Sequence, residues 1–439
     1  MLKHQSVTST VRPTRKQRLI ELGKDLLIVL LSLSTVFLAD RISTVSRLDD
    51  WIHSPVESAG PEMHRSAEAA APYLLAVRNE WGLFGTGYEG QLTQESWNQV
   101  SGLLGRALSE ADQPVSITEP HWRELLEKPG IYCAFQGEIP LEALGAWLGE
   151  ESRLTGDARE LLLAWDGTSA WLAWRDGGNC YAAAAAVSWN SAFSPVLREF
   201  SPNGAAFAYT LAESDGLYKN LDPYVLVQMN PPEPPELTGS SPDLLGDREL
   251  LRNFLNRMGF ESGGDTAYET PEGLALSEGG DRLRVNREGL VLYHAGEESR
   301  YPVASAGEVP TRQEAARAAW ELAARALSGW KGEGRLVLTG SEPTEKGWLV
   351  TLHVRFNGIP IMIGDTGWAA QVRVDGREIS YFSIHLRAYT PRDVTTPIPR
   401  ERLAAAALPS LEREGGRLML RYIDSHTDTV KAGWVVEFP

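Results

Sequence analysis

The segment Thr351-Leu352-His353-Val354-Arg355-Phe356 indicates the fold of the C-terminal part of this chain. Apolar and polar residues alternate in it, which is the period of a β-strand with one buried face and one exposed face. The alternation recurs in Ser383-Ile384-His385-Leu386-Arg387-Ala388 and in Gln371-Val372-Arg373-Val374. These segments predict strands of one antiparallel sheet whose apolar face covers a core.

The opposite face of these strands is basic, although the chain as a whole carries a net charge of −16. We expect this face to be exposed. Two readings stay open for it: an ordinary solvated surface, or a face that binds a partner or an anion. The residues concerned are His353, Arg355, Arg373, His385 and Arg387.

Helices and further strands are predicted around this sheet. Helices are expected at Asp243–Met258, Thr311–Leu327 and Arg400–Leu408, and the second begins with a capping box formed by Thr311 and Glu314. A helix followed by an antiparallel meander, repeated, indicates an α+β fold with helices packed on antiparallel sheets. The predicted strands are Ala267–Glu269, Gly273–Ser277, Arg282–Asn286, Leu290–His294, Arg335–Gly340, Trp348–Phe356, Ile359–Ile363, Ala369–Val374, Ile379–Ala388, Arg417–Ile423 and Trp434–Phe438.

The N-terminal half of the body has a mixed pattern. The turn residues Asp166-Gly167 predict a hairpin within Leu161–Trp174. The other expected elements are helices at Glu62–Arg78, Ser96–Glu110 and Leu141–Leu148, and strands at Gly130–Phe135, Leu161–Trp165, Ala170–Arg175, Cys180–Val187 and Ala206–Leu211.

A proline-rich segment predicts the clearest domain boundary. Residues 231–235 contain four prolines, which cannot continue a helix or a central strand and form a semi-rigid linker. We therefore expect an N-terminal α+β domain at 62–230 and this linker at 231–235. A middle α+β domain at 236–305 and a C-terminal domain at 306–439, with helices and an antiparallel sheet, are expected to follow.

The first forty residues predict where the chain resides. Six basic residues and one acid in residues 1–24 precede an uninterrupted apolar run from Leu26 to Ala39. Such a leader stays in the cytoplasm, so the rest of the chain is expected to be exported. The run would form about 21 Å of helix against roughly 30 Å of bilayer hydrocarbon, so a cleaved signal peptide competes with a retained anchor. We favour a cytoplasmic leader (1–24), a single transmembrane signal anchor (25–41) and a stalk (42–61), because the exit of the run lacks small residues suited to cleavage.

Composition limits the partners of the exported body. Since residues 1–24 carry +5, the remainder carries −21, which argues against nucleic acid or anionic lipid as a ligand. Two cysteines cannot make a disulfide-rich scaffold. A buried free thiol is the simpler reading of Cys133, and a Cys133–Cys180 bridge stays open because an exported location would permit it.

Three short motifs suggest chemistry, but their context does not fit. Residues 85–90 have the spacing of a dinucleotide fingerprint, yet we expect a flexible turn because no strand is predicted before them. Asp365-Thr366-Gly367 resembles an aspartic protease motif without a second copy, and predicts a hairpin turn. Ser328 and Lys331 have serine–lysine spacing, but Ser328 is expected to close a helix. We therefore expect no catalytic residue, no cofactor and no metal site.

The basic leader, the single anchor and the exported α+β body resemble the YycH/YycI regulators of Bacillota, which accompany the WalK-type (YycG) sensor histidine kinase. Residues 217–224 and 358–361 add to the resemblance, and residues 432–438 are similar to the strand endings of PepSY-like modules. The chain differs from the Lys-rich relatives we would expect in being acidic and rich in Trp and Ala.

The resemblance implies a non-enzymatic accessory protein of the cell membrane, with a cytoplasmic N-terminus and an extracytoplasmic body. Its implied partners are a sensor histidine kinase and a second Yyc-type accessory protein, and its implied role is in cell-wall homeostasis. Two other functions stay open. An exported module that binds peptide or a wall polymer would use the basic strand face, and an extracytoplasmic hydrolase would depend on Asp365 or Ser328.

Overall fold

The computed structural model describes residues 70–437, apart from residues 89, 177, 214, 229–232, 262–266, 306, 331 and 408–415. The predicted leader, anchor and stalk therefore lie outside the described residues, as does the start of the first predicted helix. The described residues all belong to one compact unit. Its helices pack against sheets in which nearly all strand pairs are antiparallel, which confirms the predicted α+β class. Within the described part of the chain, no helix has the length and apolar character needed to cross a membrane.

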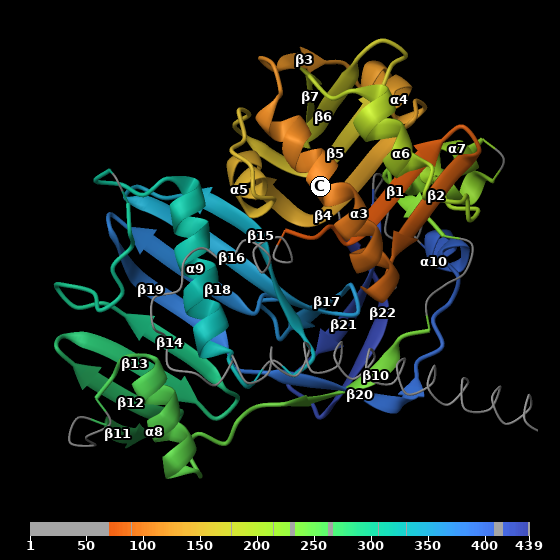
Figure 1. Ribbon diagram of the computed structural model, residues 1–439. Helices are drawn as coiled ribbons and strands as arrows, with labels where there is room; N and C mark the ends of the chain where they lie inside the picture. The colour runs from red at the N-terminus through yellow and green to blue at the C-terminus, as the bar shows by residue number, and fades with distance from the viewer. Residues whose placement is uncertain are drawn as a thin grey trace, which may run out of the picture. The chain divides into compact units, whose positions relative to one another are not determined.

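The first sheet has seven strands among the described residues, all paired antiparallel in the order β2-β1-β4-β5-β6-β7-β3 (Figure 1). These strands are β1 Leu74–Asn79, β2 Gly82–Gly87, β3 Val115–Ile117, β4 Gly130–Pro140, β5 Asp157–Trp165, β6 Ala170–Asp176 and β7 Asn179–Ala185. The helices associated with them are α3 Gly90–Ser109, α4 Glu119–Leu126, α5 Leu141–Trp147, the π-helix η1 Trp189–Phe193 and α6 Ser194–Leu197.

The Asp-Gly hairpin is confirmed. β5 and β6 pair so that Trp165 lies opposite Ala170. Asp166 Oδ1 accepts hydrogen bonds from the backbone N–H groups of Thr168 (2.7 Å) and Ser169 (2.8 Å). Gly167 adopts a φ of 108°, which a residue without a Cβ atom tolerates.

Two predicted elements in this half are wrong. Residues 74–78 form strand β1 rather than the end of a helix, and Leu74 to Val77 are all buried within the sheet. A strand buried on both faces loses its alternation, so an apolar run of this kind can be read as a helix. The predicted strand Ala206–Leu211 is limited to β8 Ala206–Phe207, which pairs with β9 Leu226–Val227, and helix α7 Ala208–Ala212 follows it.

The second sheet has thirteen strands among the described residues. Twelve follow the order β11-β12-β13-β14-β19-β18-β16-β17-β21-β22-β10-β20, and β15 pairs with β16. Their bounds are β10 Pro235–Ser240, β11 Ala267–Thr270, β12 Gly273–Glu278, β13 Asp281–Asn286, β14 Leu290–His294, β15 Arg335–Pro343, β16 Gly347–Phe356, β17 Ile359–Ile363, β18 Ala370–Asp375, β19 Glu378–His385, β20 Ala388–Thr395, β21 Arg417–Asp424 and β22 Thr429–Glu437.

This sheet curls back on itself through strands β19 and β20, which are almost continuous in the chain. β19 pairs with β14 and β18, whereas β20 pairs with β10. The path from β19 through β18, β16, β17, β21, β22 and β10 therefore returns to β20. Arg387 lies at the point where the chain passes from one strand to the other.

Helix α9 (Arg312–Ala326) covers the apolar face of this sheet, where it packs against β15, β16, β18 and β19 (Figure 1). The predicted capping box is confirmed. Glu314 N donates to Thr311 Oγ1 (3.2 Å), and Thr311 N donates to Glu314 Oε2 (2.8 Å). The other helical segments of this half are α8 Arg248–Arg257 and α10 Glu401–Ala407, and the 3₁₀ segment η2 is Gly216–Asn220.

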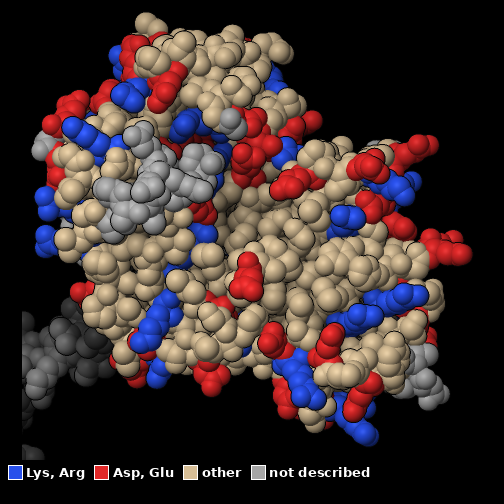
Figure 2. Space-filling view, turned by 180° about the vertical axis from the view of Figure 1, so that it is seen from behind, with Lys and Arg blue, Asp and Glu red and all other residues tan. Residues whose placement is uncertain are grey.

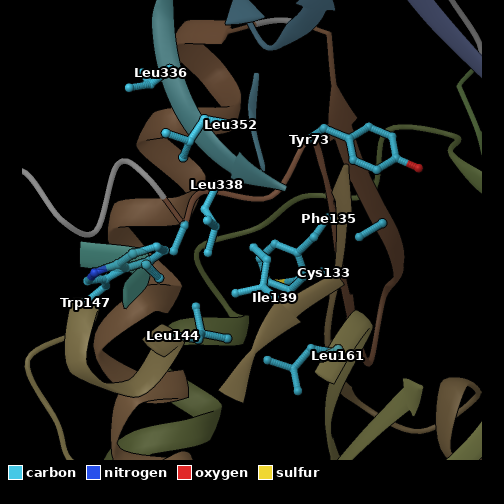
Figure 3. Packing of buried hydrophobic residues seen from close by; sticks show 14 of the residues in the cluster. Tyr73, Cys133, Phe135, Ile139, Leu144, Trp147, Leu161, Leu336, Leu338 and Leu352 are labelled. Carbon is cyan, nitrogen blue, oxygen red and sulfur yellow. The ribbon is translucent and has the colours of Figure 1, made fainter. Parts of the chain in front are cut away.

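The two sheets meet where β4 crosses β15. A Cβ atom added to Gly137 would lie 1.7 Å from the carbonyl oxygen of Thr339, so the two backbones are in direct contact. Figure 3 shows Phe135 and Ile139 of β4 beside Leu338 of β15. One hydrophobic core therefore extends from the first sheet into the second.

The predicted division of residues 236–439 into two domains does not match the sheet. β14, from the predicted middle domain, pairs with β19, and β10 pairs with β20 and β22. The segments 236–305 and 306–439 therefore share one sheet, and Pro235 of the predicted linker opens β10. Local composition identifies a proline-rich break, but it does not show which distant strand the chain joins next.

Candidate functional site: a buried arginine cluster between the two sheets

The apolar face predicted for the three alternating strands is confirmed. Leu352, Val354, Val372 and Ile384 are each no more than 1% exposed. On the opposite face, Arg373 is exposed as expected, but His353 is only half-exposed.

The expectation of exposure is wrong for the remaining three residues. Arg355 is 5% exposed, His385 is 6% exposed and Arg387 is 5% exposed. A second layer of structure covers them, and the alternation of a strand carries no information about such a layer. The five residues also separate into different places. His353 and Arg355 lie where the two sheets meet, whereas His385 and Arg387 lie where β19 leads into β20.

Arg355 links the two sheets and the start of the described chain. Its Nε donates to Gln136 Oε1 of β4 (3.1 Å), and its Nη1 donates to the carbonyl oxygen of Ala71 (2.8 Å). Its Nη2 is buried and has no hydrogen-bond partner. No carboxylate among the described residues forms an ion pair with this guanidinium.

Strand β21 adds two more arginines to the face that carries Arg355. β17 pairs with β16 so that Arg355 lies opposite Pro360, and β21 runs parallel to β17 with Tyr422 beside Ile361. Because neighbouring residues of a strand point to opposite faces, Pro360 and Arg421 both lie on the face opposite to Ile361 and Tyr422. Arg421 therefore shares a face with Arg355. Arg417 lies four residues before Arg421 and shares that face.

One half of this arginine cluster is balanced by acids. Glu160 of β5 is 2% exposed and forms ion pairs with Arg175 (2.8 Å) and with Arg417. Arg417 also pairs with Asp222 at 3.2 Å. Two guanidiniums thus face two carboxylates.

The other half has more bases than acids. Arg159 of β5 and Arg421 of β21 both form ion pairs with Glu437 near the end of β22. Arg355 makes the third guanidinium of this half. Among the described residues, Glu437 therefore pairs with two of these arginines and no carboxylate pairs with the third, Arg355. Each of the three has a buried N–H without a partner in the described structure: Nε of Arg159, Nη2 of Arg355 and Nε of Arg421.

The pKa shifts separate the two halves in the same way. Burial lowers the pKa of Arg355 to about 10. It also lowers the pKa values of Arg159 and Arg421, to which repulsion by Arg417 and by Arg159, respectively, contributes. Burial also acts against the charge of Arg417, but Glu160 and other neighbours more than offset it, so the pKa of Arg417 is raised. The half with Glu437 is therefore short of negative charge.

His353 borders this cluster as a neutral group. Its Nδ1 lies 2.7 Å from Thr339 Oγ1. Burial lowers the pKa of His353 to about 3, and the nearby charges of Arg421 and Arg355 contribute to the shift. It therefore adds no positive charge near neutral pH.

A buried, fully hydrogen-bonded ion pair lies where β19 leads into β20. Asp424 is 1% exposed and accepts from Arg387 Nε (2.7 Å), Arg387 Nη2 (2.9 Å), Tyr389 O–H (2.8 Å) and His426 N (2.9 Å). These bonds join β20 to the turn after β21. A carboxylate with this many donors has a structural role, because its negative charge is already satisfied.

His385 lies beside that ion pair, at the end of the sheet. Its ring centroid is 5.7 Å from that of His426 and 5.2 Å from that of Trp368. Its Nε2 lies 3.4 Å from Thr366 Oγ1, and its Nδ1 is buried without a partner. Burial lowers the pKa of His385 to about 4, and His426 adds to the shift.

The glycine-rich segment 85–90 is not the flexible turn that we expected, because strand β2 ends at Gly87 and helix α3 begins at Gly90. The glycines nevertheless serve packing. A Cβ atom would lie 2.6 Å from Ala205 Cβ at Gly85, 1.9 Å from Leu74 Cδ2 at Gly87, and 2.5 Å from Asn357 Cα at Gly90. The backbone of the β16–β17 turn thus covers the start of α3, where a phosphate would have to bind.

The hairpin predicted at Asp365 is wrong, whereas the helix end predicted at Ser328 is confirmed. Asp365 is exposed in the turn between β17 and β18, but these strands both pair with β16 and not with each other. Helix α9 ends at Ala326, so Ser328 follows the end of a helix, and Gly329 has a φ of 82°. Both cysteines are buried and free, which matches the simpler reading of Cys133.

One group of carboxylates has metal-like spacing within the described residues: Glu138, Asp157 and Asp176 offer ligand atoms within 4.8 Å of one another. Arg312 already occupies it, because its Nη1 lies 2.6 Å from Asp157 Oδ1. A guanidinium in contact with the acids opposes the binding of a cation there.

The sequence-based prediction missed most of the arginine cluster. Arg159, Arg417, Arg421 and Glu437 were not identified, although the odd-numbered positions of 417–421 place both β21 arginines on one strand face. The sequence pattern that could have identified the two β21 arginines is the alternation of basic residues with apolar residues along a predicted strand. Only the pairing of β21 with β17 joins that face to the face of Arg355.

Comparison with known proteins leaves the chain unassigned: no protein-family model, no curated protein sequence and no solved structure matches it significantly.

Proposed function

We propose that this protein is a membrane-tethered, extracytoplasmic accessory regulator of a sensor histidine kinase, and that it acts by protein–protein contact. The basic leader and the apolar run Leu26–Ala39 support the tether, and the resemblance to YycH/YycI regulators supports the partner. The strongly acidic body fits a protein partner better than nucleic acid or an anionic lipid surface.

The observation that carries the proposal is the contact between Arg355 and Ala71. Ala71 lies on the segment that leads from the N-terminal residues into β1, and Arg355 of the second sheet holds its carbonyl oxygen at 2.8 Å. The same guanidinium holds Gln136 of the first sheet. A displacement of this segment therefore changes contacts between the sheets, and a partner that alters the junction of the sheets displaces the segment. Such linkage is what a regulator needs in order to couple two regions.

Crosslinking in intact cells tests the proposal. A tagged full-length chain is crosslinked and purified, and the captured proteins are identified by mass spectrometry. The matched control is a chain in which Leu26–Ala39 is replaced by an unrelated apolar anchor. We expect a sensor histidine kinase among the captured proteins.

The two chains together locate the contact. If only the chain with the native anchor captures the kinase, the contact lies in the membrane. If both chains capture the kinase, the contact lies on the exported body. If neither chain captures a kinase under conditions in which known membrane neighbours are recovered, the proposed function is wrong.

A further inference from the structure

We propose that Arg159, Arg355 and Arg421 form an oxyanion-binding site, which the side chain of Glu437 fills in the unliganded protein and vacates for a phosphate or carboxylate group. The site goes beyond the proposed function, and it does not depend on the identity of any protein partner.

Unbalanced buried charge is the first reason. Among the described residues, Glu437 pairs with Arg159 and Arg421, and no carboxylate pairs with Arg355. In the other half of the cluster, Arg175 and Arg417 share Glu160 and Asp222. A buried charge without a counter-charge is costly, and arginine does not lose its proton to avoid the cost. A bound anion removes this imbalance.

Unused hydrogen-bond donors are the second reason. Arg355 is 5% exposed and its Nη2–H has no partner, and a buried N–H of Arg159 and another of Arg421 are also unpartnered. Guanidinium groups bind carboxylate and phosphate oxygens through pairs of parallel N–H donors. Arg175 Nε and Arg417 Nη1 in the other half are also buried and unpartnered, so the free donors supply the chemistry of an oxyanion site and the shortage of carboxylate distinguishes the half with Glu437.

The Glu437 side chain is partly exposed, so a soluble anion can reach and replace it. The side chain of Glu437 is 28% exposed, and that of Arg159 is 33% exposed, whereas that of Arg421 is 9% exposed. Glu437 and Arg159 are therefore the members of the site that solvent reaches, whereas Arg421 and Arg355 are buried. An outward rotation of the Glu437 side chain would free the donors of Arg159 and Arg421 that it now holds.

Two other acids, Glu160 and Glu138, act on Arg159 through space and raise its pKa, against the larger effect of burial. Glu160 already pairs with Arg175 and Arg417, and neither acid forms an ion pair with Arg159 among the described residues. Glu138 is exposed and lies outside the group of buried donors. Figure 2 shows acidic and basic side chains interspersed on the face that it presents, so selectivity for an anion has to come from the buried arginines rather than from a basic surface.

The test compares the full chain, purified in detergent, with the variant Glu437→Gln. Unfolding temperatures are measured by tryptophan fluorescence in sodium phosphate, sodium acetate and sodium chloride of equal ionic strength. Because phosphate stabilises many proteins non-specifically, Arg373→Gln serves as a control that alters an exposed arginine on the same sheet. A double variant, Glu437→Gln with Arg421→Gln, removes one of the proposed donors.

We expect Glu437→Gln to unfold at a lower temperature than the wild-type protein in chloride, because Arg159 and Arg421 then lose their ion-pair partner. Phosphate or acetate should raise the unfolding temperature of Glu437→Gln. This rise should exceed that of the wild-type protein by about 2 °C or more. The double variant should lose this extra rise, and Arg373→Gln should behave like the wild-type protein. The anion that gives the larger rise identifies the preferred oxyanion.

An equal rise for the wild-type protein, Glu437→Gln and the double variant would mean a general salt effect and would overturn the proposal. If Glu437→Gln does not fold in chloride, recovery of its folded state in phosphate or acetate is the expected result, and failure in all three salts counts against the site. The kinase plays no part in these measurements, so their outcome is independent of the crosslinking result.

Discussion

Glu401 is a buried carboxyl group with very little to stabilise its charge. It is 7% exposed, and its Oε2 accepts a hydrogen bond from the backbone N–H of Gln228 at 2.8 Å. Burial raises the pKa of Glu401 from 4.5 to about 8, and the hydrogen bond from Gln228 opposes this only in part. The carboxyl group is therefore mostly neutral at about pH 7 in the folded protein.

We predict that Glu401→Gln makes the protein more resistant to alkaline pH. The folded wild-type protein keeps a proton that the unfolded chain loses above pH 4.5, so its stability falls as the pH rises from 4.5 to about 8. Because Gln has no carboxyl group to lose a proton, the variant does not show this fall in stability. At about pH 9 the variant should be more stable by about 2–4 kcal/mol, and at about pH 4 the two proteins should differ little. Urea unfolding at both pH values measures this, and parallel pH profiles would contradict it.

His385 gives the opposite pH dependence. Its pKa is lowered from 6.5 to about 4 by burial, with His426 adding to the shift. The unfolded chain gains a proton below pH 6.5 that the folded protein does not accept until about pH 4, so stability falls as the pH falls through this window.

We predict that His385→Asn flattens the acid side of the stability profile between about pH 6.5 and pH 4, by about 1–3 kcal/mol across that window. The comparison is His294→Asn, since His294 is exposed and should leave the wild-type profile unchanged. Thermal unfolding at several pH values measures both variants. Equal acid sensitivity of the His385 variant and the wild-type protein would show that this ring does not cause the loss.

At the scale of elements, α9 organises the apolar face of the second sheet, and the capping box determines where it begins. Thr311 Oγ1 satisfies the N–H of Glu314, and the Glu314 carboxylate satisfies the N–H of Thr311. Ala315, Ala319 and Leu322 of the helix are each 3% exposed or less, so the helix start and the core packing depend on one another.

We predict that Thr311→Ala lowers the free energy of unfolding by about 1 kcal/mol, because one of the four helix N–H groups at the start loses its acceptor. Thr311→Ser keeps the hydroxyl and should retain most of the stability. Urea denaturation of the two variants measures the difference. A Ser variant as unstable as the Ala variant would mean that the methyl group, rather than the hydroxyl, stabilises this position.

At the scale of the whole molecule, the contact between Gly137 and Thr339 determines how closely the two sheets approach. One hydrophobic core passes through this junction, and the arginine cluster lies at the same junction. A side chain at position 137 would force β4 away from β15, because a Cβ atom would lie 1.7 Å from a carbonyl oxygen.

We predict that Gly137→Ala lowers the free energy of unfolding by about 3 kcal/mol or more, since the backbones on both sides must move. Gly102→Ala is the matched control. Position 102 lies within helix α3 with no atom within 4 Å of an added Cβ, so the change should stabilise the protein by about 0.5–1 kcal/mol. Chemical denaturation compares the two. Similar small effects at both positions would mean that the sheets separate easily at this junction.

Local elements could be predicted from the sequence wherever a pattern has a local physical cause. The alternation around Leu352 and Ile384, the Asp166-Gly167 hairpin and the Thr311 cap all depend on neighbours in the chain, and each lies where the sequence placed it. The α+β class followed from these elements. β1 was misread, because burial on both faces removes the period that distinguishes a strand from a helix.

Strand pairing and the covering of each sheet face depend on tertiary contacts. β10 pairs with β20 and β22, and the first sheet contacts Arg355, so part of the predicted basic face is buried while Arg373 stays exposed. Arg159 is distant in the chain from Arg421 and Glu437, yet Glu437 forms ion pairs with both arginines. Burial and charge balance depend on such non-local packing. The sequence supplied the residues with the required chemistry, and the packing of the two sheets determined that they meet.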